Sequence, residues 1–220
     1  MVPGAASAPR PPAGGGDGGR PAAGPEVVAG PPARSATIAA MSTTVDRTAL
    51  AARIAEASLL RGTFTLRSGR TSSWYLDKYR FSTRPEILRE LGTMFAERIP
   101  GGVTRLAGAE LGGIPLVTAA SLASGLPSIF IRNARKDYGT AKQLEGILEA
   151  GDSVLLVEDV ATTGGQVLEA ATVIEAEGAT VAGIVAVIDR GEGARANVEQ
   201  AGYAFDALFT ASDLGITDGD

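Results

Sequence analysis

The sequence predicts a doubly wound α/β domain with a mostly parallel sheet. Short apolar runs, of which Val154-Leu155-Leu156-Val157 is the clearest, have the length and continuity of strands that are buried on both faces. Segments with helical periodicity alternate with these runs. Polar and glycine-rich residues follow the runs directly, so they should gather at the carboxyl edge of the sheet, where ligands bind in such folds.

Two helices and a hairpin are expected before the alternating units begin. Apolar residues at helical spacing predict a helix over residues 48–61, with Asp46 as its N-cap. The segment FTLRSGRTSSWYLD, residues 64–77, has two extended runs around a Ser-Gly turn and therefore predicts a β-hairpin. A second helix is expected over residues 85–98 for the same periodic reason as the first.

Strand, loop and helix then alternate along the chain. Strands are expected at 105–108, 128–131, 154–157 and 181–188, and helices at 115–124 and 166–177. A basic loop, residues 132–142, follows the second of these strands. This alternation is typical of βαβ units, which place helices on both faces of a parallel sheet.

The first forty residues have a different composition from the rest. Residues 1–40 are mostly Gly, Pro, Ala and Ser and show no apolar periodicity, so we expect a disordered leader. The leader lacks the apolar centre of a signal peptide. Met41 precedes a normal helical segment, so we expect either that Met41 is the true start or that the leader is a dispensable tail. The folded domain is therefore expected to span residues 41–220.

Composition narrows the chemistry. The chain has 220 residues, a formal net charge of -5, no cysteine and no histidine. An acidic chain is a poor general binder of nucleic acid. Without cysteine or histidine there is no thiolate nucleophile, no zinc–thiolate site and no serine–histidine triad. Carboxylates, lysines, arginines, hydroxyls and backbone amides remain, and a hard ion such as Mg²⁺ is the natural metal for such groups.

The most informative segment is VLLVEDVATTGG, residues 154–165. Two adjacent acids, Glu158 and Asp159, come after a buried strand and before a Thr- and Gly-rich turn that opens a helix. The turn can offer amides and hydroxyls to a phosphate, whereas the acids suit sugar hydroxyls or positive charge. Together these preferences describe a ribose 5-phosphate. A solvated acid pair followed by an ordinary helix cap is the alternative interpretation.

VLLVEDVATTGG resembles the phosphoribosyl pyrophosphate-binding motif of the type I phosphoribosyltransferases. Three more segments resemble the orotate phosphoribosyltransferases: FTLRSGRTSSWYLD, RKDYGTAKQLEG at 135–146 and IDRGEG at 188–193. The likeness covers residues 62–214. It implies a small N-terminal hood over about 41–84, a core over about 85–214, and transfer of a phosphoribosyl group from its Mg²⁺ pyrophosphate to orotate, which gives orotidine 5′-monophosphate. It also implies a cytoplasmic homodimer with shared sites.

The resemblance assigns roles to single residues. The ribose-phosphate loop would consist of Glu158, Asp159, Val160, Ala161, Thr162, Thr163, Gly164, Gly165 and Gln166. Thr162 would also touch the base, Tyr75 would lie against orotate, and Arg190 would pair with the orotate carboxylate. Mg²⁺ would arrive with the phosphoribosyl pyrophosphate, without direct protein ligands.

Other residues would bind the diphosphate. Arg67 falls where the family has a basic residue that reaches it, and a lid would contribute Arg132, Asn133, Lys136 and Tyr138. Catalytic roles would fall to Lys136, beside the leaving pyrophosphate, and to Glu158 and Asp159. Gly112-Gly113 would line the diphosphate with backbone, or would simply be a tight turn.

Several alternatives stay open. Many family members have lysine where this chain has Gly112 and Asn133, and histidine where it has Tyr138. Trp74 and Tyr75 could pack rather than bind, and Arg190 could pair with its neighbour Asp189. A purine base in place of orotate, or a regulator that senses phosphoribosyl pyrophosphate without catalysis, are the two rival functions.

Overall fold

The computed structural model describes residues 44–65, 69, 71–133 and 143–217. The N-terminal elements are α1 (Arg47–Ser58), β1 (Leu59–Thr65), β2 (Thr71–Leu76) and α2 (Lys78–Ser82). The remaining helices are α3 (Pro85–Ala96), α4 (Gly113–Ser124), α5 (Gly165–Ala176), α6 (Ala194–Gln200) and the short 3₁₀ turn Ser212–Leu214. The remaining strands are β3 (Arg105–Ala109), β4 (Ser128–Ile131), β5 (Leu144–Glu145), β6 (Ser153–Ala161), β7 (Thr180–Asp189) and β8 (Phe205–Thr210).

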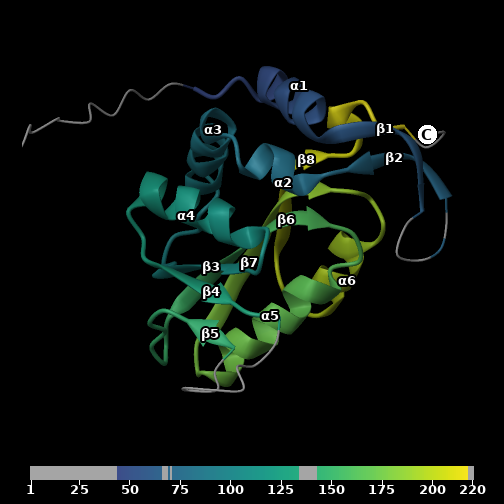
Figure 1. The fold of residues 1–220 in the computed structure, drawn as a ribbon. Helices are drawn as coiled ribbons and strands as arrows, with labels where there is room; N and C mark the ends of the chain where they lie inside the picture. The colour runs from purple at the N-terminus through teal and green to yellow at the C-terminus, as the bar shows by residue number, and fades with distance from the viewer. Residues whose placement is uncertain (1–43, 66–68, 70, 134–142, 218–220) are drawn as a thin grey trace, which may run out of the picture. The chain divides into compact units, whose positions relative to one another are not determined.

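Six strands form the main sheet, in the order β5-β4-β3-β6-β7-β8 (Figure 1). The pairs β3–β4, β3–β6, β6–β7 and β7–β8 are parallel, and the short edge strand β5 runs antiparallel to β4. A separate antiparallel pair joins β1 and β2. The doubly wound, mostly parallel sheet predicted from the sequence is therefore confirmed.

Strand β6 divides two hydrophobic cores. Leu155 and Val157 belong to the cluster that also holds residues of α3 and α4, whereas Val154 and Leu156 belong to the cluster with residues of α5 and α6. Successive side chains on a strand point to opposite faces, so a continuous apolar run is what two covered faces require. The interpretation of this run as a strand buried on both faces is confirmed.

Element boundaries differ from the sequence expectation in two places that matter. The helix expected over 48–61 ends at Ser58, because Leu59 and Leu60 pair across β1 and β2 with Leu76 and Tyr75. The strand expected over 154–157 continues to Ala161 through its pairing with β7. The two acids therefore lie inside β6 rather than in the loop after it.

The N-terminal elements pack over the α3 side of the sheet. Leu50 and Ile54 of α1 and Phe81 of α2 are fully buried in the same cluster as Leu106 and Leu155. Asp46 accepts a hydrogen bond from the Ala49 amide at 3.0 Å, which confirms it as the N-cap of α1. This packing brings α2 next to the carboxyl end of β6 (Figure 1).

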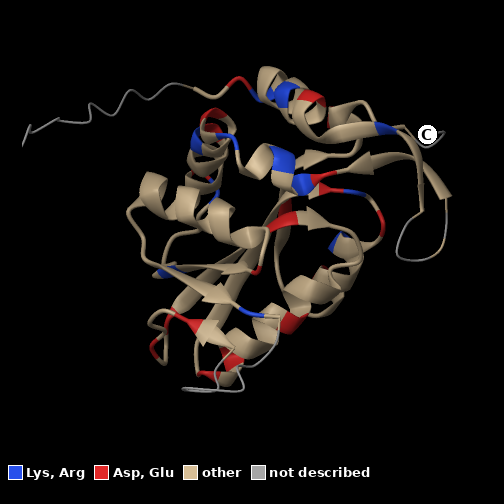
Figure 2. Cartoon of the chain, viewed as in Figure 1, with Lys and Arg blue, Asp and Glu red and all other residues tan. Residues whose placement is uncertain are grey.

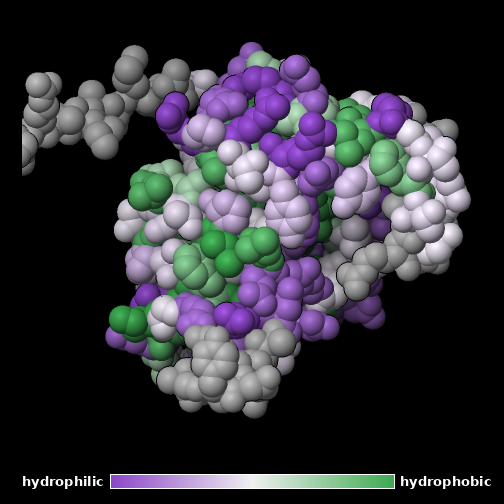
Figure 3. Space-filling view, viewed as in Figure 1, coloured by the Kyte–Doolittle hydropathy of each residue, from purple (hydrophilic) through white to green (hydrophobic). Residues whose placement is uncertain are grey.

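The face seen in Figure 3 is hydrophilic over α1 and α2 and more apolar over α4. Leu122 of α4 is 83 % exposed. Across the described part of the chain, no helix has the length and apolar character needed to cross a membrane.

Candidate functional site

The side chains of Glu158 and Asp159, which are adjacent residues of β6, point to opposite faces of the strand. Glu158 and Asp159 are 4 % and 1 % exposed, so both carboxyl groups are buried. Asp159 accepts hydrogen bonds from the Val160 amide at 2.6 Å and pairs with Lys78 Nζ at 2.8 Å. Glu158 Oε2 is buried and has no hydrogen-bond partner among the described residues. A buried carboxylate oxygen without a partner indicates a place for a donor that is supplied by a ligand.

The environment of Glu158 favours its neutral form. Burial raises the pKa of Glu158 well above its usual range, and the adjacent charge of Asp159 raises it further. Lys78 acts in the opposite direction but does not cancel these effects. A ligand that brings hydroxyl donors or positive charge to Glu158 would therefore favour release of its proton.

Glu158→Gln should make the thermal stability of the free protein less dependent on pH. A raised pKa means that the folded state holds the proton more tightly than the unfolded chain, so a rise of pH above the ordinary value of 4.5 destabilises the wild type. We expect the wild-type Tm to fall more between about pH 5 and about pH 8 than the Tm of the variant. Thermal melts across this range test the expectation, and parallel pH profiles for the two proteins would contradict it.

The Thr-Gly turn after β6 presents its amides to an open hollow. Gly164 has φ 81° and ψ 0°, a left-handed conformation that favours glycine, and Gly165 begins α5. The carbonyls of Thr162 and Thr163 accept hydrogen bonds from the Ala194 amide at 3.0 Å and from Asn197 Nδ2 at 2.8 Å. Because a planar trans peptide points its N–H away from its C=O, the amides that follow these carbonyls face away from α6.

The hollow has a volume of about 70 Å³ and is lined by Glu158 and by residues 160–167. The amides of Thr163, Gly164 and Gly165 have no acceptor among the described residues. Unpaired amides at the start of a helix form a good anion site. Glu158 and the amides of the turn therefore border one small space, with opposite chemical preferences.

Asp159 faces a second loop, which joins β3 to α4. The loop contains a cis peptide between Glu110 and Leu111. A Cβ atom at Gly112 would lie 1.4 Å from Asp159 Oδ2, so the carboxylate occupies the space that a side chain at this position would need. Gly113 already belongs to α4, which begins two residues before the helix expected at residue 115. Gly112 thus permits the loop to lie directly against the acid.

Gln166 joins the start of α5 to two loops. Its Nε2 donates to the Glu110 carbonyl at 3.0 Å and to Asn133 Oδ1 at 3.4 Å, and the Asn133 amide donates to Glu110 Oε1 at 2.7 Å. Arg132 Nη1 lies 3.7 Å from Glu145, and its buried Nε has no partner among the described residues. The start of the basic loop is therefore fixed against both the β3–α4 loop and α5.

Two of the three predicted base-binding residues, Tyr75 and Arg190, lie on the hairpin and on the loop after β7. The Arg190 guanidinium is 4.6 Å from the centre of the Trp74 ring, and its Nη2 pairs with Glu192 at 2.8 Å. Arg190 thus pairs with Glu192 and not with Asp189, whose Oδ1 accepts from the Gly191 amide at 2.9 Å. Trp74 is buried, which fits a packing role, and Tyr75 is 46 % exposed.

Sequence reasoning missed Lys78, which contacts Asp159 although 81 positions separate the two residues. Lys78 directly follows the hairpin motif and is one of three lysines in the whole chain, the others being Lys136 and Lys142. That scarcity is the signal that could have drawn attention to it. Figure 2 shows basic positions on α2 close to acidic positions on β6.

Of the predicted residues, the structure groups Glu158 and residues 160–166 around one hollow, with Asp159 on the other side of the strand. Arg132 and Asn133 join this edge of the sheet through Gln166. Arg67, Lys136 and Tyr138 lie outside the described residues. Their assignments remain predictions.

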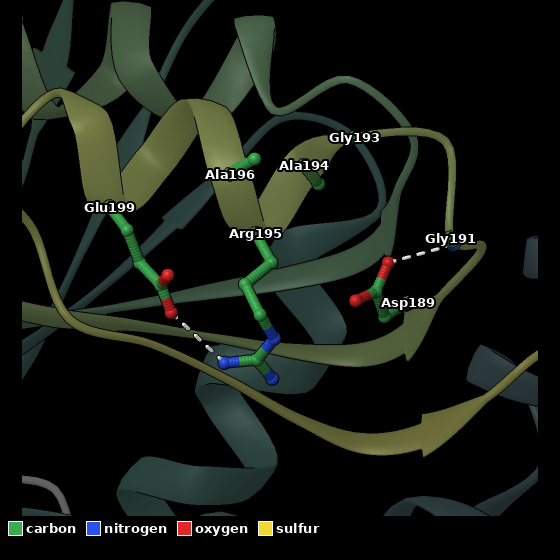
Figure 4. A pocket seen from close by; sticks show the side chains of 7 residues that line it. All are labelled: Asp189, Gly191, Gly193, Ala194, Arg195, Ala196 and Glu199. Carbon is green, nitrogen blue, oxygen red and sulfur yellow. Dashed lines mark hydrogen bonds and ion pairs between the residues drawn. The ribbon is translucent and has the colours of Figure 1, made fainter.

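A larger hollow of about 290 Å³ lies beside α6 and contains none of the predicted site residues (Figure 4). Arg195 and Glu199, one helical turn apart, pair at 3.2 Å along its wall. Its volume exceeds that of the hollow at the Thr-Gly turn, but among the described residues it holds no buried carboxylate oxygen without a partner, and its Glu199 is paired with Arg195. The chemistry therefore favours the smaller hollow as the site.

Comparison with known proteins places this geometry in a family. Residues 83–202 match the phosphoribosyl transferase domain. Orotate phosphoribosyltransferase of Methanocella arvoryzae is 45% identical over 153 residues, which cover 70% of this chain and 87% of that protein. The chain belongs to the orotate phosphoribosyltransferases. The orotate phosphoribosyltransferase of Thermococcus kodakarensis is also 45% identical, over 72% of this chain and 87% of its own length.

Solved structures of the family share the fold. The Mycobacterium tuberculosis orotate phosphoribosyltransferase in complex with Fe(III) dicitrate matches with a TM-score of 0.72 and 30% identity, over 78% of this chain and 100% of that chain. Its complex with 5-phospho-alpha-D-ribosyl 1-diphosphate matches with a TM-score of 0.67 over the same shares. Adenine phosphoribosyltransferase of Leishmania donovani, at 20% identity and a TM-score of 0.58, shares the fold alone.

Proposed function

We propose that this enzyme transfers the 5-phosphoribosyl group from Mg²⁺ phosphoribosyl pyrophosphate to orotate, which gives orotidine 5′-monophosphate and pyrophosphate. The bond from the ribose C1 to the pyrophosphate oxygen breaks, a bond from C1 to the orotate N1 forms, and orotate loses its N1 proton. The first bond would break largely before the second forms, so positive charge develops on the sugar. The protein then needs to position the reactants and stabilise charge rather than form a covalent intermediate.

The observation that carries the proposal is the position of Glu158 Oε2. This buried oxygen has no partner among the described residues, and it borders the same hollow as the amides of the Thr-Gly turn. The hydroxyl groups of a sugar phosphate could donate to Glu158, and its phosphate could accept from the amides of the Thr-Gly turn. Glu158 would hold the ribose from the side of the turn, and Asp159 from the side of the Gly112 loop, and both would stabilise the developing positive charge.

The base would bind between the hairpin and the loop after β7. The exposed ring of Tyr75 offers an apolar face, and Thr162 adds a hydroxyl at the turn. Arg190 is held by the Trp74 ring and by Glu192, and its buried Nε has no partner among the described residues. An arginine with donor capacity left suits the carboxylate of orotate. A purine lacks this carboxylate, which disfavours the purine alternative.

The diphosphate would be bound by groups at both ends of the basic loop. Arg132 and Asn133 fit this role by position, and Arg67, Lys136 and Tyr138 are proposed for it from the family resemblance alone. Mg²⁺ would arrive with the diphosphate, whose oxygens match its preference for oxygen ligands, and would neutralise part of the pyrophosphate charge. We further propose that the enzyme is a cytoplasmic homodimer with shared sites.

An absorbance assay of orotate tests the function directly. Orotate should disappear only when phosphoribosyl pyrophosphate and Mg²⁺ are both present, and equimolar pyrophosphate should appear. Adenine, guanine and hypoxanthine should neither react nor compete with orotate, because they lack the carboxylate for Arg190. No orotate consumption under these conditions would refute the substrate assignment, and consumption of a purine would support the rival function.

A further inference from the structure

Lys78 connects the N-terminal elements to the acid pair. It is the first residue of α2, and its Nζ lies 2.8 Å and 3.1 Å from the two carboxylate oxygens of Asp159. The Lys78 side chain is 31% exposed, whereas that of Asp159 is 1% exposed. The ammonium group is therefore positioned between solvent and the buried acid, at the edge of the sheet where we propose that the sugar phosphate binds.

Position 112 is directed at the same carboxylate. Because a Cβ atom there would meet Asp159 Oδ2 at 1.4 Å, a side chain at 112 and the present orientation of Asp159 exclude each other. Gly112 leaves this space to the carboxylate, which Lys78 then holds from α2. The cation beside Asp159 is therefore Lys78 of α2, whereas the β3–α4 loop contributes only the backbone of Gly112.

Charge balance explains why the pair needs this cation. Two adjacent carboxylates repel each other when both are ionised, and burial increases the cost. Burial alone would lower the pKa of Lys78, but the charges of Asp159 and Glu158 outweigh this effect and the pKa is raised. The ammonium group therefore stays charged at neutral pH and faces the Asp159 carboxyl group, while Glu158 Oε2 remains without a partner among the described residues.

We propose that Lys78 is a positioning residue of the active site, which orients Asp159 toward the ribose from α2. The inference rests on the proposed function of the acid pair. A buried ion pair is by itself weak support for stability, so a purely structural link between α2 and β6 is the interpretation that the experiment has to distinguish.

Lys78→Met, which keeps the length of the side chain but removes its charge, should lower kcat by about 10²-fold, in line with the loss of one electrostatic group at an active site. The KM for orotate should change little, because Lys78 does not contact the proposed base-binding residues. The acid limb of the kcat profile should move to higher pH, because loss of the cation favours protonated carboxyl groups. Lys78→Arg should recover part of the rate.

Arg47→Met is the matched control. Arg47 also joins an N-terminal helix to the rest of the domain, through an ion pair of 2.8 Å with Asp213, but it lies outside the proposed site. We expect both variants to have a lower Tm, and only Lys78→Met to lose rate when both are assayed well below their Tm. A kcat of Lys78→Met within about twofold of the control would overturn the inference.

A lysine introduced at position 112 gives a further test, which compares the Lys78→Met variant with a double variant. Gly112→Lys should reduce turnover in the wild-type background, where its Cβ meets Asp159, but should raise turnover at least about tenfold in the Lys78→Met background, where Asp159 is released to pair with the new lysine. Simple addition of the two losses would show that the positive charge beside Asp159 does not carry the effect of Lys78 and would overturn the inference. If the wild type itself does not consume orotate, the proposed function fails, whereas normal turnover by Lys78→Met defeats only this inference.

Discussion

Asp159→Asn is expected to lower kcat/KM for the transfer to orotate by about 10²–10³. The substitution keeps the size of the side chain and its capacity to accept from the Val160 amide, but it removes the negative charge that would stabilise the developing positive charge on the sugar. Lys78 would lose its ion pair at the same time. Steady-state kinetics with phosphoribosyl pyrophosphate varied at saturating orotate measure the effect.

Asp152→Asn separates this effect from loss of stability. Asp152 is also buried and pairs with an arginine, Arg105, at 2.8 Å, but the pair ties the start of β3 to the start of β6, at the opposite ends of these strands from the acid pair. Its loss should lower the Tm and leave kcat unchanged at temperatures where the protein is folded. Turnover of Asp159→Asn within about twofold of Asp152→Asn would contradict a role for Asp159 in the chemistry.

Gly164→Ala is expected to weaken binding of phosphoribosyl pyrophosphate by roughly 10²-fold, because a small displacement of groups that position a substrate has effects of that size. An alanine at φ 81° costs about 1–2 kcal/mol. Its Cβ would also lie 3.1 Å from Val198 Cγ2 and 3.4 Å from the Ala194 carbonyl, so the turn must shift away from α6. The amides of the turn would then no longer converge on the phosphate.

Gly125→Ala is a close control for this substitution. Gly125 has φ 78° and ψ 2°, nearly the same conformation as Gly164, and a Cβ there would meet no atom within 4 Å. The backbone cost should therefore be similar, so both variants should have a lower Tm, with the larger decrease for Gly164→Ala because only its Cβ meets neighbouring atoms. Calorimetric titration with phosphoribosyl pyrophosphate should separate them, and equal affinities for the two variants would show that the turn does not hold the phosphate.

Short-range patterns of apolar residues predicted most of the strands and helices and their order along the chain. The VLLV run, its two-faced burial and the order of strands and helices around it all depend on residues close in sequence. The end of the first helix depended on a distant partner, because Leu59 became a strand residue only through its pairing with Leu76. Periodicity in a short window does not contain that information.

The site was predictable only where one continuous segment forms it. The turn at 162–165 could be interpreted from its own residue types, since hydroxyls and glycines before a helix suit a phosphate. Lys78 contacts Asp159, which is 81 positions away in the sequence, and Gln166 contacts Asn133 and Glu110, which are 33 and 56 positions away. These contacts follow from the packing of α2 and α5. The depth of Glu158 was also missed, because it follows from the extension of β6 alongside β7.

The hydrogen bonds that α6 makes to the back of the Thr-Gly turn have a consequence for recognition. With the carbonyls of Thr162 and Thr163 already engaged by Ala194 and Asn197, the peptide planes of the turn cannot rotate without breaking these bonds. The proposed receptor for the phosphate would therefore be preorganised, and little free energy of association would be lost to ordering it. Discrimination between phosphorylated and unphosphorylated sugars would then reside in a rigid element, whereas adjustment to the rest of the substrate is left to the other loops.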